Sequence, residues 1–75
     1  MKTVTTIFQA RDGTSYARID GVTYSVNYRS HGPRRRVDGG WLVDGVVTEI
    51  RWDIDERYCS APERKAVVAL QGGAS

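Results

Sequence analysis

The stretch from Thr14 to Arg29 decides the fold and reads Thr-Ser-Tyr-Ala-Arg-Ile-Asp-Gly-Val-Thr-Tyr-Ser-Val-Asn-Tyr-Arg. Two segments of alternating polarity are joined by Asp20-Gly21, a pair that readily adopts the positive φ angles of a type I′ hairpin turn. A two-residue turn pairs Ile19 with Val22, and the register then places most apolar side chains on one face. The sequence therefore predicts an antiparallel hairpin here.

The same Asp-Gly pair recurs, which is typical of a chain that reverses direction several times. A two-residue turn at Asp12-Gly13 pairs Phe8 with Ala17 and brings Phe8 onto the apolar face of the central hairpin. A further tight turn is predicted at Asp44-Gly45. Asp38-Gly39 is either another turn or part of a loop.

A basic segment follows the central hairpin and reads Ser-His-Gly-Pro-Arg-Arg-Arg-Val from Ser30 to Val37. Gly32-Pro33 is expected to end the preceding strand, because proline cannot donate to a strand ladder and restricts the residue before it. Arg34, Arg35 and Arg36 are therefore predicted to lie on an exposed loop.

The C-terminal segment carries the signals of a helix start. Ser60 precedes Pro62 and Glu63, the arrangement of a capping box with proline in the first turn. Gly72-Gly73 would end the helix. Its apolar side, which we expect to cover part of the sheet, consists of Ala66, Val67 and Leu70.

Together these signals predict an α+β, mainly β fold: a curled five-stranded antiparallel β-meander or small barrel with one C-terminal helix. Residues 1–75 are expected to form one small domain, since a chain of this length supports a single core. SH3 and OB barrels have the nearest shapes, although no motif assigns the chain to either family. The expected strands lie near 3–11, 14–19, 22–30, 40–43 and 46–55, and the helix near 61–71.

Charge is distributed unevenly along the chain. Residues 1–37 contain seven Lys or Arg and two Asp, whereas residues 38–75 contain four Lys or Arg and seven Asp or Glu. This asymmetry predicts separate basic and acidic surfaces if the fold keeps the halves apart. Nine of the eleven cations are Arg, whose planar guanidinium suits phosphate and carboxylate groups.

The basic cluster predicts a non-catalytic binding protein that docks on a nucleic acid or a nucleoprotein, with an affinity that falls as salt is added. The alternative is a solvated loop with no binding role, whose arginines pair with the acidic half of the chain. Sequence-tolerant single-strand binding is disfavoured, because Tyr16 is the only aromatic residue expected on the polar sheet face. The predicted binding residues are Arg18, Arg29, His31, Arg34, Arg35, Arg36, Trp41 and Tyr16.

A competing interpretation is a phage or mobile-element inhibitor or adaptor that binds a host protein complex. Trp41 and Trp52 are expected in the core, but an exposed Trp41 would be a natural binding anchor. The exposed helix side, with Arg64, Lys65 and Val68, is the alternative contact surface. An uncovered edge strand could instead pair with a second copy to form a homodimer.

Catalytic and metal-binding patterns are missing from the sequence. Asp53, Asp55 and Glu56 have no calcium-loop spacing, and His31 with Cys59 lacks a third orienting residue. We therefore expect no enzymatic activity, no metal and no cofactor. The single cysteine fits a reducing compartment, and no apolar run has the length of a signal peptide or membrane span, so a cytoplasmic location is expected.

Overall fold

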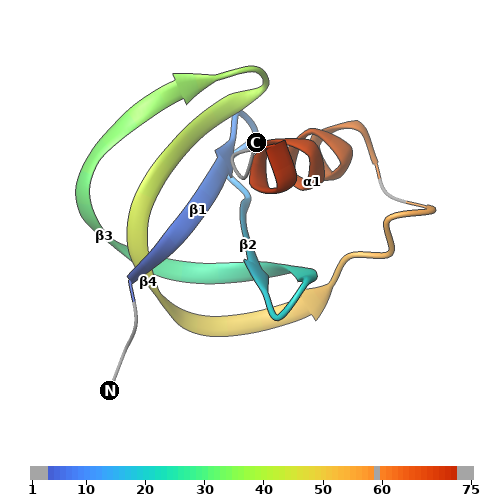
Figure 1. Ribbon diagram of the computed structural model, residues 1–75, viewed down its shortest axis with the longest axis horizontal. Helices are drawn as coiled ribbons and strands as arrows, with labels where there is room; N and C mark the ends of the chain where they lie inside the picture. Colours follow the sequence, from blue (N-terminus) through green and yellow to red (C-terminus); the bar gives the residue numbers. More distant parts are fainter. Residues whose placement is uncertain (1–3, 59, 73–75) are drawn as a thin grey trace.

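The computed structural model describes residues 4–58 and 60–72. It contains β1 (Val4–Ala10), β2 (Ser15–Ile19), β3 (Val22–Val37), β4 (Gly40–Asp53) and α1 (Ala61–Gly72) (Figure 1). The prediction of a mainly β chain with one C-terminal helix is confirmed. The prediction of five strands is wrong, because the two strands expected after residue 39 are one continuous strand, β4.

The four strands form a closed antiparallel barrel. Each strand pairs with its neighbours in sequence, and β1 also pairs with β4 to close the circle. β3 and β4 are long and bend strongly, and Figure 1 shows them curling around β1 and β2. The average strand of a globular protein is about five or six residues long. Four strands can close into a barrel here because β3 and β4 are much longer than that average.

The turn at Asp20-Gly21 is confirmed. Asp20 has a φ of 52° and Gly21 a φ of 82°, and Ile19 pairs with Val22. Positive φ at both central residues defines the type I′ turn, whose twist matches that of the flanking strands.

The register predicted from Asp12-Gly13 is wrong by one residue. Phe8 pairs with Tyr16 rather than Ala17, because the loop has three residues instead of two. The Ala10 amide donates to the Thr14 carbonyl oxygen at 2.8 Å, and Gly13 has a φ of 95°. The loop is a turn followed by Gly13 in the left-handed backbone conformation. The register differs from the predicted one by one residue, and this difference places the Phe8 side chain on the opposite face of the sheet.

The tight turn predicted at Asp44-Gly45 is also wrong. Gly45 lies inside β4 and pairs with Thr5 on one side and Ser30 on the other. A Cβ atom built on Gly45 would lie 2.7 Å from the Arg29 carbonyl oxygen, so glycine is needed for close approach rather than for reversal. The chain reverses instead at Asp38-Gly39, where Gly39 has a φ of 86° and Val37 pairs with Gly40.

The loop predicted around Gly32-Pro33 is a strand. Ser30 pairs with Gly45 and Arg34 with Val43, so β3 carries extra residues between two points of the ladder. Proline is tolerated at such a bulge because its missing N–H is not required for pairing. The arginines that follow therefore belong to a β-hairpin, not to a loop.

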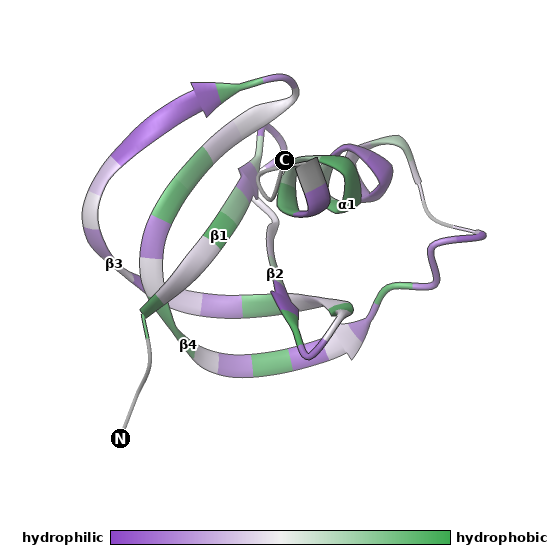
Figure 2. Ribbon diagram, viewed as in Figure 1, coloured by the Kyte–Doolittle hydropathy of each residue, from purple (hydrophilic) through white to green (hydrophobic). Residues whose placement is uncertain are grey.

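Buried side chains form two clusters on opposite faces of the sheet, and bands of opposite hydropathy alternate along β4 in Figure 2. The cluster away from α1 consists of Ile7, Ala17, Val26 and Val43, with Tyr24, Tyr28 and Val47 packed against it. The cluster beneath α1 consists of Phe8, Ala10, Tyr16, Ile54, Ala66 and Val67, with Val37, Leu42, Ala69 and Leu70 around it.

The helix begins as the capping signal predicts. The Ser60 amide donates to Glu63 Oε1 at 2.8 Å, and the Arg64 amide donates to the Ser60 carbonyl oxygen at 2.8 Å. The predicted apolar side faces the barrel, with Ala66 and Val67 buried on it. Within the described residues, no helix combines the length and the apolar character that a membrane crossing requires.

Candidate functional site

The three consecutive arginines lie at the end of β3 and pair with the beginning of β4. Arg34 pairs with Val43, Arg35 with Leu42 and Arg36 with Trp41, and all three arginines are exposed. They form the purple segment at the end of β3 in Figure 2. Because neighbouring side chains of a strand point to opposite faces, Arg34 and Arg36 share a face with Trp41, whereas Arg35 shares the other with Leu42. We call Arg34, Arg36 and Trp41 the basic face.

No ion pair among the described residues neutralises the basic face. The ion pairs of the described residues join Arg57 to Asp55 and Lys65 to Asp38, and none reaches Arg34, Arg35 or Arg36. The Arg34 guanidinium instead lies over the partly buried Trp41 ring, 5.0 Å from its centroid. The described residues therefore do not form the alternative arrangement, in which these arginines pair with carboxylates of the acidic half.

The other predicted cations lie elsewhere. Arg29 and His31 border a separate hollow of about 330 Å³ with Val4, Val46 and Thr48. Arg18 belongs to β2, next to the turn that Figure 1 shows at the opposite end of the barrel from the β3–β4 turn. The fold therefore divides the predicted basic surface into several parts.

Two aromatic predictions are corrected by the packing. Tyr16, expected on the exposed polar face, is only 3% exposed because α1 and Ile54 cover that face. Burial raises its pKa, and it has no open ring surface on which a base could stack. Trp52, expected in the core, is 47% exposed, and the Arg51 guanidinium lies 4.8 Å from its ring centroid.

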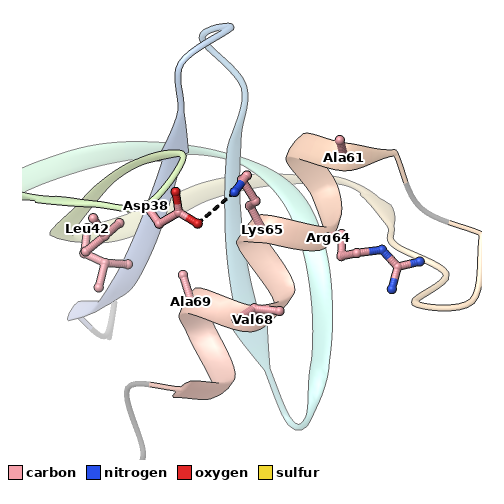
Figure 3. Close-up of a pocket in the computed structure, with 8 residues that line it drawn as sticks. Asp38, Leu42, Ala61, Arg64, Lys65, Val68 and Ala69 are labelled. Carbon is pink, nitrogen blue, oxygen red and sulfur yellow. Dashed lines mark hydrogen bonds and ion pairs between the residues drawn. The ribbon is translucent and has the colours of Figure 1, made fainter.

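A groove that the sequence did not predict separates the β3–β4 hairpin from α1 (Figure 3). It has a volume of about 600 Å³ and is lined mainly by aliphatic carbon. Lys65 Nζ and Asp38 Oδ2, 2.7 Å apart, join the helix to the hairpin turn across it, and this ion pair lowers the pKa of Asp38. The lining residues are Val37, Asp38, Leu42, Ala61, Arg64, Lys65, Val68 and Ala69. We call this surface the docking groove.

Within residues 4–58 and 60–72, no group of three or more His, Cys, Asp or Glu side chains is placed to hold a metal ion. Cys59, half of the Cys/His pair considered from the sequence, lies outside the described residues. No family model, curated protein or solved structure matches the chain.

Proposed function

We propose that this chain is a non-catalytic protein that binds a nucleic acid or a nucleoprotein through the basic face. The observation that carries the proposal is the pair of exposed guanidinium groups on this face, those of Arg34 and Arg36, which no described carboxylate neutralises. Exposed arginines donate paired N–H groups to phosphate oxygens and release condensed counterions.

The arrangement of the hairpin supports this proposal in two ways. Arg34 and Arg36 are two residues apart on one strand face, so their Cα atoms are separated by roughly 7 Å and each can contact a different phosphate. Trp41 pairs with Arg36 and has Arg34 over its ring, so the part of the ring that stays exposed is a surface on which a base can stack beside both arginines. Trp41 thereby supplies one stacking position, whereas Tyr16, the aromatic residue that the sequence offered, is buried.

A salt titration tests the proposal. Fluorescence anisotropy of a labelled single-stranded oligonucleotide and of its duplex would be measured against the full chain at several salt concentrations. We expect log affinity to fall linearly with log salt, with a slope of about −1 to −3 for a few neutralised phosphates. An affinity that does not change with salt, or no binding of either probe at low salt, would reject it.

A second candidate is the inhibitor or adaptor of a host protein complex, of the kind that phages and mobile elements carry. The docking groove favours it, because apolar grooves beside charged residues are typical of protein-binding surfaces. Recovery of one host protein that stays bound after nuclease treatment would support this candidate over the first.

A further inference from the structure

We propose that the docking groove binds an acidic amphipathic segment of a partner protein. This site is separate from the basic face and does not depend on nucleic-acid binding. Figure 3 shows Leu42 on one side of the groove and Val68 and Ala69 on the helix opposite it.

The apolar character of the groove requires a partner with apolar side chains. Val37, Leu42 and Ala69 are only partly buried against the core, and Val68 is 63% exposed. Val68 is an apolar residue on the outward side of a helix that buries Ala66 and Val67. The volume of about 600 Å³ accommodates a few aliphatic side chains of an incoming segment.

The charges around the groove select an acidic partner. A second hollow shares Asp38, Ala61 and Lys65 with the docking groove and extends to Arg11, so the two hollows adjoin. The nearby carboxylates are already engaged: Asp38 with Lys65, and Asp12 with the amide and hydroxyl of Thr14. Arg64 forms no ion pair among the described residues, so an incoming carboxylate can pair with it. Lys65 lowers the pKa of the Asp38 carboxyl most, Arg11 lies close enough to lower it further, and Arg11 adds positive charge beside the groove.

Other occupants fit less well. Nucleic acid would find no aromatic ring among the lining residues. A second copy docked by two-fold symmetry would set this surface, with Arg64 at its border, against an identical surface, so like charges would face each other across the interface. The strand edge near Arg34 to Arg36 is similarly unsuited to self-pairing, since charged side chains discourage it.

The groove and the basic face can be occupied together. Val37 and Leu42 belong to the face of the hairpin that borders the groove, whereas Arg36 and Trp41 belong to the opposite face. A partner in the docking groove therefore contacts one face of the β3–β4 hairpin, and the basic face lies on the other. This arrangement suits an adaptor that holds a protein and a polyanion at once.

The test uses the isotope-labelled full chain and a synthetic peptide with leucines at helical spacing and glutamates elsewhere. Amide shifts would be followed by NMR. We expect shifts at Leu42 and Val68, and affinity about tenfold lower for Arg64→Glu and for Val68→Glu. Both side chains are exposed, so these variants should keep the dispersed spectrum of the folded chain.

Matched controls make the outcome decisive. Arg57→Glu, an exposed charge reversal outside the groove, should bind the peptide like the parent chain. A peptide with lysine in place of glutamate should bind at least about tenfold more weakly. Equal binding of the two peptides, or an unchanged affinity in Arg64→Glu, overturns the proposal. A doubled sedimentation mass that Val68→Glu abolishes also overturns it, in favour of a second copy as the occupant.

Discussion

The Arg34 guanidinium carbon lies 5.0 Å from the centroid of the Trp41 ring. The two residues are diagonal neighbours across the β3–β4 hairpin, because Trp41 pairs directly with Arg36 and Arg34 with Val43. Diagonal neighbours in a sheet are within reach of long and aromatic side chains. An exposed cation–π contact contributes about 0.5–1 kcal/mol, so it orients Arg34 without preventing its release to a phosphate.

The division of the arginines between two faces predicts an asymmetric response to charge reversal. Arg34→Glu with Arg36→Glu should lower oligonucleotide affinity by about 100-fold or more, because both lost charges belong to the basic face. Arg35→Glu should have a clearly smaller effect, because Arg35 shares the opposite face with Leu42. Anisotropy titrations at one low salt concentration measure both. Equal losses in the single and double variants would contradict the assignment of faces.

Trp41 should report binding through its fluorescence. In Trp52→Phe, Trp41 is the sole tryptophan, and a base stacked on its ring should quench its emission. In Trp41→Phe, the remaining Trp52 lies at the acidic far end of β4, near Asp53 and Asp55, and should not respond. Titration of both variants with a single-stranded oligonucleotide separates these outcomes. Quenching confined to Trp52 would place the nucleic acid elsewhere.

Gly45 should tolerate no side chain. Gly45→Ala places a Cβ 2.7 Å from the Arg29 carbonyl oxygen, and we expect a loss of about 1–3 kcal/mol in the free energy of unfolding. Gly32→Ala is the matched control, because its added Cβ meets no atom within 4 Å in the described part of the chain. That change should be neutral or stabilising by up to about 1 kcal/mol. Urea denaturation measures both, and equal costs would show that close approach at Gly45 is unimportant.

Two threonines should respond oppositely to replacement by valine. Thr23 is 1% exposed, and its Oγ1 has no hydrogen-bond partner within the described residues, so Thr23→Val should be neutral or stabilising by about 1 kcal/mol. Thr14 Oγ1 donates to Asp12 Oδ1 at 2.6 Å and also hydrogen-bonds with the Tyr16 hydroxyl at 2.9 Å. Thr14→Val should therefore cost about 1 kcal/mol. Thermal and urea unfolding test the pair, and a large loss in Thr23→Val would reveal a satisfied hydroxyl.

Burial of Tyr16 predicts a loss of stability at alkaline pH. Burial raises the pKa of the Tyr16 phenol, so the unfolded chain releases this proton first as the pH rises. The contribution is complete below about pH 10 and is lost as the pH rises through the folded-state pKa. Tyr16→Phe should flatten this part of the stability profile, whereas Tyr58→Phe, at a residue 82% exposed, should leave it unchanged. A profile identical in all three chains would show that Tyr16 ionises freely.

Short sequence signals correctly predicted the features that depend only on residues close together in the chain. The Asp20-Gly21 turn joins alternating strands, and the Ser60 to Glu63 cap precedes the helix, as predicted. Each depends on contacts within a few residues, so the local chemistry is sufficient. The concentration of exposed arginine before residue 37 was also visible in the sequence.

Other features depended on pairing between distant strands. Asp44-Gly45 and Asp38-Gly39 are the same dipeptide, but the first is held in a strand by β1 and β3 and only the second reverses the chain. The division of the arginines between two faces follows from that choice of turn, as does the groove formed when α1 packs beside the hairpin. The sequence by itself thus determined a mainly β chain with a capped helix and a basic segment. Only the tertiary structure decided which side chains of β1 and of the β3–β4 hairpin share a face, because register there is fixed by long-range pairing and a slip of one residue reverses every side chain.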